Sequence, residues 1–211
     1  MKTYATVLAL AAFTCARDMP AIVVPTEDEM SEEDSAYWNM VHERNYYSRN
    51  TWLGVFQGLY GMSGKVDRPT EDCFGEWIPD KMQELYYFRE TAKGSLMEID
   101  MDMAAVAAYD VVDLTFLNDR YCHFRQTFYD VYTYCNDTES CEMSSVLENL
   151  QKNAFNVITQ VSTAGSIFKE QPWEEMDMEG RGYALNQLGH SMASLYADLI
   201  GFNASKVQRT D

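Results

Sequence analysis

Residues 185–202, LNQLGHSMASLYADLIGF, carry the pattern that decides the fold class of this chain. Their large apolar side chains recur every three or four residues, which is the period of one face of an α-helix. Small residues recur every four residues at Gly189, Ala193 and Ala197, and they permit close approach of another helix, from this chain or from a neighbouring copy. The large apolar positions are Leu185, Leu188, Met192, Leu195, Leu199 and Phe202.

The same helical period recurs along most of the chain. Apolar residues repeat at helical spacing over residues 104–134 and 143–168, and two further helices are expected from about residue 35 to 60 and from Pro79. Met97 to Met103 alternates apolar and acidic residues, and we expect an extended lead-in to the next helix there. The pattern predicts an all-α bundle of about five amphipathic helices with short loops, forming a single domain over residues 35–205.

The composition of the chain limits which classes of partner it can bind. The chain has 211 residues, of which 46% are hydrophobic and 23% charged, and this is the balance of a globular protein. Its formal net charge is −17. Such a charge repels phosphate backbones and anionic membrane surfaces, so we expect no nucleic-acid partner.

The first residues have the layout of a secretory signal. Residues 1–16, MKTYATVLALAAFTCA, combine a positive Lys2, a short apolar run and small residues at the end, and we expect their removal. The apolar run is far shorter than the roughly 20 residues of a membrane span, so no transmembrane segment is expected after cleavage. Residues 17–34 form an acidic linker or propeptide, and residues 206–211 form a polar tail. We therefore expect a secreted protein or one of the secretory-pathway lumen.

Four cysteines remain once Cys15 leaves with the signal, and an even number suits an oxidising compartment. Cys135 and Cys141 flank a polar, turn-rich segment that a local disulfide would close. Cys73 would then pair with Cys122. The spacing predicts two disulfides and contains no Cys-x-x-Cys motif of a redox or zinc site.

Two glycosylation sequons fit the same compartment. Asn136-Asp-Thr138 lies inside the shorter disulfide loop, and Asn203-Ala-Ser205 follows the last apolar helix. We expect both asparagines to lie in exposed loops and to carry glycans.

An acidic cluster is the one candidate metal site. It combines six carboxylates, and without an EF-hand loop it would bind calcium weakly, with dissociation constants on the order of 10⁻⁴ to 10⁻³ M. No other cofactor is expected. The alternative EF-hand start at Glu175, Asp177 and Glu179 lacks the required twelfth-position acid, and these acids suit the first turn of the last helix instead. The six clustered acids are Glu27, Asp28, Glu29, Glu32, Glu33 and Asp34.

No arrangement of residues is typical of catalysis. His123 lies four residues after Asp119, but two ligands do not make a zinc site. His190 neighbours Ser191, and adjacent helical residues point about 100° apart, so they cannot form a nucleophile–base pair. The sequence favours a protein that is not an enzyme, with an unrecognised hydrolase as an alternative.

Three segments resemble a known family. Cys73-Phe-Gly-Glu-Trp-Ile, Asn118-Asp-Arg-Tyr-Cys-His-Phe-Arg and Asn186-Gln-Leu-Gly-His-Ser-Met resemble small, secreted, helical proteins of ciliated protozoa. The resemblance covers residues 73–202 and implies secretion and a helical fold. It implies no catalytic role.

These features together favour a non-enzymatic secreted acidic protein that acts through surface contacts or self-assembly, as an extracellular or secretory-granule component. The alternative is a carrier that encloses a lipid or another small apolar ligand in the bundle core, because the chain is rich in Met and aromatic residues.

Overall fold

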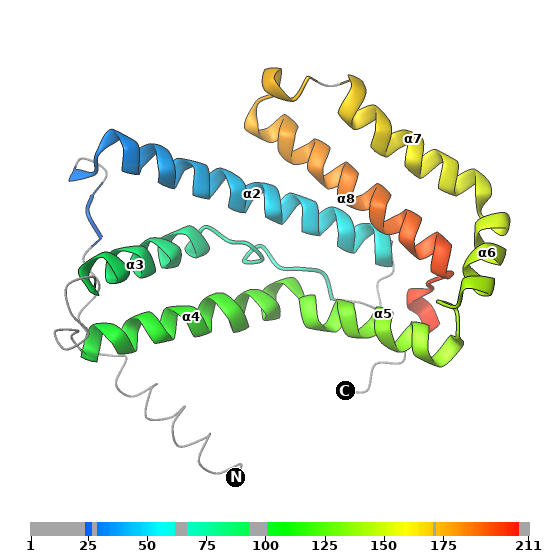
Figure 1. Ribbon diagram of the computed structural model, residues 1–211, viewed down its shortest axis with the longest axis horizontal. Coiled ribbons are helices and arrows are strands. Elements are labelled where there is room, and N and C mark those ends of the chain that lie inside the picture. The colour runs from blue at the N-terminus through cyan, green and yellow to red at the C-terminus, as the bar shows by residue number, and fades with distance from the viewer. Residues whose placement is uncertain (1–23, 27–28, 62–66, 93–100, 171, 207–211) are drawn as a thin grey trace, which may run out of the picture. The chain divides into compact units, whose positions relative to one another are not determined.

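The computed structural model describes residues 24–26, 29–61, 67–92, 101–170 and 172–206, and all regular structure in these residues is helical (Figure 1). The predicted all-α fold is confirmed. Two short 3₁₀ turns, η2 at Trp173–Glu175 and η3 at Ala204–Lys206, complete the description. The α-helices are α2 (Glu32–Tyr60), α3 (Trp77–Ala92), α4 (Met101–Cys122), α5 (Phe124–Thr138), α6 (Met143–Lys152), α7 (Ala154–Glu170) and α8 (Met178–Ile200).

Two of the expected helices are each divided in two, so the described residues hold seven helices. The helix expected over residues 104–134 breaks at His123, whose φ of 56° is left-handed. The carboxylate of Asp119 accepts a hydrogen bond from the backbone N–H of Arg125 at 2.7 Å and so caps the new helix. The helix expected over residues 143–168 breaks at Asn153, which ends α6 outside helical geometry.

Three helix starts also differ from expectation, and one is that of α3, which begins at Trp77 and not at Pro79. Ser31 accepts a hydrogen bond from the backbone N–H of Asp34 at 3.1 Å and caps α2, so Glu32 to Asp34 belong to that helix and not to the linker. Residues 101–103, expected in the extended lead-in, already belong to α4, and residues 97–100 lie outside the described residues.

The chain divides into two compact units, and each is described by itself. The first unit contains α2 up to Met40, α3, and α4 up to Leu117. Trp38 of α2 packs edge-on against Tyr86 of α3, with ring centroids 5.6 Å apart. Lys81 of α3 pairs with Asp110 of α4 at 2.8 Å. The single domain expected over residues 35–205 stays a prediction.

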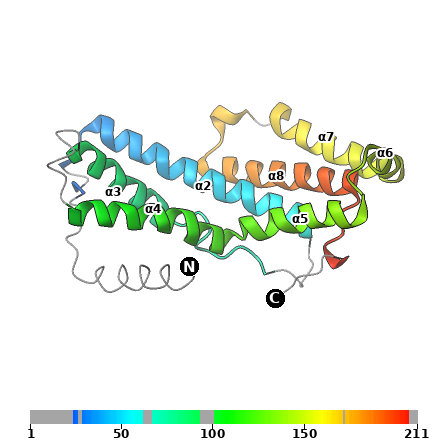
Figure 2. The same ribbon diagram turned by 60° about the horizontal axis from the view of Figure 1, so that its bottom comes forward.

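The second unit is built on close packing of α2 against α8, which lie side by side in both ribbon views (Figures 1 and 2). A Cβ atom added to Gly58 would lie 2.8 Å from the Cβ of Ala193, and one added to Gly54 would lie 2.9 Å from the backbone nitrogen of His190. The small residues of α8 therefore meet a helix of the same chain. Gly189 is also tightly packed against α2, because a Cβ atom added to it would lie 3.1 Å from the backbone nitrogen of Val55.

The other helices of this unit surround that contact. α7 packs along α8 (Figure 1), and Asn153 Nδ2 donates to the carbonyl of Asp198 at 3.0 Å. The buried rings of Phe56 and Tyr60 form the core at the end of α2, and Phe202 packs against them. Tyr60 donates a hydrogen bond to the buried carboxylate of Asp130 on α5 at 2.8 Å.

Both predicted disulfides are present. Cys73 joins Cys122 with Cα atoms 4.7 Å apart, and Cys135 joins Cys141 with Cα atoms 5.1 Å apart. The first closes a loop of 49 residues, a constraint that contributes about 4 kcal/mol in the chain-entropy account. The second closes a segment that is partly helical and not only a loop, because Cys135 to Thr138 form the last turn of α5.

The α2–α8 contact predicts opposite effects for two glycine-to-alanine substitutions. Gly189→Ala places a methyl group against the backbone of α2 and should lower the free energy of unfolding by about 2–3 kcal/mol. Gly165→Ala in α7 meets nothing within 4 Å and should raise it by roughly 0.5–1 kcal/mol. Urea unfolding of both variants checks this. Equal stability of the two variants would contradict close packing at Gly189.

Candidate functional site

The two sequons differ in their local structure. Asn136 is exposed but lies in the last turn of α5, so the expectation of a loop was wrong there. The hydroxyl of Thr138 in the same sequon donates to the carbonyl of Tyr134. Asn203 is exposed outside any helix, and its side-chain oxygen accepts hydrogen bonds from Ser205 N and Oγ at 3.0 and 2.6 Å. Glycosylation of both stays a prediction.

The acidic cluster is only partly described, since Glu27 and Asp28 lie outside the described residues. The carboxylate of Glu29 accepts a hydrogen bond from the backbone of Thr26 at 3.0 Å, which lowers the pKa of Glu29. Glu32, Glu33 and Asp34 form the first turn of α2, where they complement the helix dipole. No group of three metal-ligating side chains occurs among the described residues. Weak calcium binding stays a prediction.

The histidines are not brought into a catalytic arrangement. Asp119 directs its carboxylate to Arg125 and not to His123. The backbone of His190 faces α2 at Gly54 and Gly58. Asp177 caps α8 by accepting a hydrogen bond from the backbone of Gly180 at 2.7 Å, and Glu179 lies in the first turn, as expected. Glu175 belongs to η2, so its expected place in that turn was wrong.

The first unit contains a buried carboxylate between α3 and α4. Asp110 is fully buried, and Lys81 Nζ lies 2.8 Å from Asp110 Oδ1 and 2.9 Å from Glu84 Oε2. One ammonium group therefore serves two carboxylates. Burial raises the pKa of Asp110 to about 6 although Lys81 opposes the shift, and burial also raises the pKa of Asp113, one turn further along α4.

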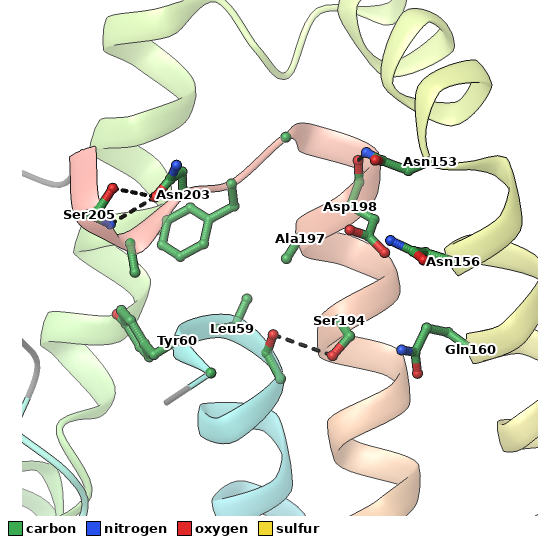
Figure 3. A pocket seen from close by; sticks show the side chains of 15 residues that line it. Leu59, Tyr60, Asn153, Asn156, Gln160, Ser194, Ala197, Asp198, Asn203 and Ser205 are labelled. Carbon is green, nitrogen blue, oxygen red and sulfur yellow. Dashed lines mark hydrogen bonds between the residues drawn. The ribbon is translucent and has the colours of Figure 1, made fainter. Parts of the chain in front are cut away.

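The second unit contains a polar pocket of about 680 Å³ where the end of α2, the start of α7 and the end of α8 meet. Figure 3 shows the side chains of Asn156 and Gln160 extending from α7 toward α8, where Ser194 and Asp198 lie. Ser194 Oγ donates a long hydrogen bond of 3.4 Å to the carbonyl of Gly58. The volume lies within the range of small-molecule sites.

Sequence reasoning missed this pocket, although the sequence contains a signal for it. Four carboxamides recur at helical spacing beside the apolar stripe, at Asn149, Asn153, Asn156 and Gln160. Asn149 and Asn153 donate to the last carbonyls of α8, at Leu199 and Asp198 respectively, which have no partner within their own helix. The other two amides line the pocket.

An apolar groove of about 540 Å³ lies between α2, α5 and α8 of the same unit. Its lining is mainly aromatic and aliphatic. It also includes Thr127, a residue that carries a hydroxyl and is only 2% exposed. That hydroxyl has no hydrogen-bond partner among the described residues. The lining residues are Trp52, Val55, Leu59, Thr127, Phe128, Val131, Tyr132, Cys135, Met192, Ala193 and Tyr196.

The helix pair α6 and α7 exposes large apolar side chains, some on the predicted apolar stripe of residues 143–168 and some, Phe155 and Ile158, beside it. α6 buries none of its residues, and Met143 is 73% exposed. Phe155 and Ile158 of α7 are 82% and 67% exposed. We name the exposed set the α6–α7 apolar face; it comprises Met143, Leu147, Leu150, Phe155, Ile158 and Val161.

Comparison of the chain with protein families, with curated proteins and with solved structures finds no match in any of the three. The resemblance to secreted ciliate proteins therefore stays a prediction. Within the described part of the chain, no helix combines the length and the apolar character needed to cross a membrane.

The buried carboxylate of Asp110 predicts a specific dependence of stability on pH. Its pKa is about 6 in the folded protein against an ordinary 3.8, so the folded state binds the proton more tightly than the unfolded state. This contribution to stability is complete below the ordinary pKa and is lost as the pH rises through 6. The free energy of unfolding should therefore fall by about 1 kcal/mol from pH 5 to pH 7 through this group alone.

Thermal unfolding of wild type and Asp110→Asn between pH 5 and pH 7 isolates that contribution, because the variant should lack it. Asp80→Asn, which removes an exposed acid from α3, is the matched control and should retain the wild-type slope. Parallel curves for Asp110→Asn and wild type would refute the prediction. Lys81, Glu84 and Asp113 are common to all three proteins.

Proposed function

We propose that this chain is a secreted, non-enzymatic acidic protein that acts by self-association through the α6–α7 apolar face. The observation that carries the proposal is the orientation of α6, whose apolar side chains face solvent. Its apolar side chains Met143 and Leu147 are exposed, while Asn149 on its opposite side hydrogen-bonds to α8. Exposed apolar patches of this kind are typical of interaction sites, because water contact with large apolar side chains is unfavourable.

Charge favours a second copy of the chain as the occupant. Residues 143–170 carry two acids, Glu148 and Glu170, and two bases, Lys152 and Lys169, although the whole chain has a net charge of −17. Two copies that meet at this face therefore bring together surfaces without net charge and keep their acidic surfaces apart. The exposed apolar residues of α4, such as Phe116, lie on a helix with four acids and one base, which would repel its own copy.

Secretion is supported by several independent features. The two disulfides persist in oxidising compartments and not in the cytosol. The leader over residues 1–16 and the sequons at Asn136 and Asn203 fit the same route.

Polar substitution on the face should dissociate the assembly without unfolding the chain. The double variant Leu147→Ser with Ile158→Ser removes two exposed apolar side chains, so the variant should sediment as a monomer where wild type forms dimers or larger species. Analytical ultracentrifugation across a concentration series measures this, and circular dichroism monitors the fold.

Phe116→Ser is the matched control, because Phe116 is 63% exposed on α4 of the other unit. It should leave the association unchanged. A wild-type protein that stays monomeric at every concentration, or a double variant that associates as wild type does, would overturn the proposal.

A second candidate function, carriage of an apolar ligand, is favoured by the groove between α2, α5 and α8. Thr127 has a buried hydroxyl without a hydrogen-bond partner among the described residues, beside an apolar lining. A ligand with one hydrogen-bonding head group on an apolar body would supply that partner. The net charge of −17 disfavours a carboxylate head and favours a neutral one, as in a fatty alcohol.

Thr127→Val should separate the two roles of that hydroxyl. Loss of an unpaired buried hydroxyl should raise the free energy of unfolding by about 1 kcal/mol, while the affinity for 1-decanol should fall several-fold. Quenching of Trp52, which lines the groove, reports binding. Thr159→Val is the control, since Thr159 on α7 is exposed and bonded to the carbonyl of Phe155. Unchanged decanol binding in Thr127→Val would exclude this groove as the site.

A further inference from the structure

The polar pocket contains side-chain groups that the fold itself does not use. Asn153 and Ser194 donate their hydrogen bonds to backbone carbonyls. The carboxamides of Asn156 and Gln160 and the carboxylate of Asp198 form no hydrogen bond or ion pair within the described part of the chain. Figure 3 shows these three groups on facing sides of the gap between α7 and α8.

Asp198 is the one acid that lines the pocket, and it is half-buried. No residue that lines the pocket is Lys, Arg or His. Among the described residues, Asp198 forms no ion pair, and neither does Lys206, the basic residue that follows it in the sequence. Burial raises the pKa of Asp198 with nothing to oppose the shift. A half-buried carboxylate without a partner is therefore stabilised by a cation that enters from solvent.

We propose that this pocket binds the ammonium group of a small organic amine. The carboxylate of Asp198 pairs with the charge, and the carboxamide oxygens of Asn156 and Gln160 accept the remaining N–H donors. Leu59 and the ring of Phe202 line the same pocket and contact the apolar stem of the ligand. This site is separate from the α6–α7 apolar face, and the inference does not rest on the proposed self-association.

Other ligand classes fit the same groups less well. An anion meets Asp198 and a chain with a net charge of −17. A calcium ion requires six to eight oxygen ligands, usually with several carboxylates, and this pocket has one carboxylate. A neutral alcohol leaves the negative charge of the half-buried Asp198 uncompensated. An ammonium group with three donors satisfies one carboxylate and two amide oxygens.

A matched set of four-carbon probes tests the proposal on the intact mature protein. n-Butylamine, n-butanol and butyrate share one stem and differ in the charge of the head group. We expect butylamine to shift the side-chain NH₂ resonances of Asn156 and Gln160 in a saturable titration followed by NMR. Butanol and butyrate should bind at least about tenfold more weakly, because a charge-assisted hydrogen bond contributes more than 1.4 kcal/mol.

Two substitutions with the same change in net charge separate the pocket from general attraction. Asp198→Asn should weaken butylamine binding at least about tenfold. Glu179→Gln, an exposed acid in the first turn of α8, should alter it less than twofold. Gln160→Met, which keeps the length and removes the acceptor, provides a second variant and should weaken binding several-fold. Equal binding of butanol and butylamine, or wild-type affinity in folded Asp198→Asn, would overturn the proposal.

Discussion

The contact between α2 and α8 is the constraint on which the second unit depends. Gly54, Gly58 and Gly189 bring two helix backbones so close that a single methyl group at any of them would overlap the partner helix. Such contact gives extensive dispersion attraction between backbones that larger side chains would keep apart. Because α8 is fixed on α2, one side of it is free to receive α7. α5 lies against the C-terminal end of α2 through Tyr60 and Asp130. The apolar groove and the polar pocket both include residues of α2 and α8.

Two polar side chains attach α6 and the start of α7 to the end of α8. Asn149 and Asn153 satisfy carbonyls at the C-terminal end of α8, which otherwise lack partners. This arrangement turns Met143, Leu147 and Leu150 of α6 toward solvent, so the start of the predicted apolar stripe becomes a surface. An exposed apolar surface of this kind favours association between copies of the chain, whereas the acidic charge limits which surfaces can meet.

Three buried or half-buried aspartates differ in how the fold compensates their charge. Asp130 accepts hydrogen bonds from Tyr60 and Gln126, and Asp110 shares the ammonium of Lys81 with Glu84. Asp198 has no such partner among the described residues. The first two therefore belong to the interior of their units, and the third faces a pocket where a ligand can supply the missing charge.

The sequence by itself determined the helical class and the positions of most helices, because helical period is a local property. It predicted both disulfide pairs, but four cysteines allow three pairings, and only the folded chain brings Cys73 to Cys122. It also determined that small residues on α8 would meet a helix. It did not determine the breaks at His123 and Asn153, because each accompanies a side-chain hydrogen bond that the apolar pattern does not show. Asp119 accepts from the backbone of Arg125 beside the first break, and Asn153 donates to the carbonyl of Asp198 at the second. Only the tertiary structure decided which face of α6 points toward α8. An apolar stripe predicts burial, but the amides of Asn149 and Asn153 bond to the end of α8 and fix the opposite face inward.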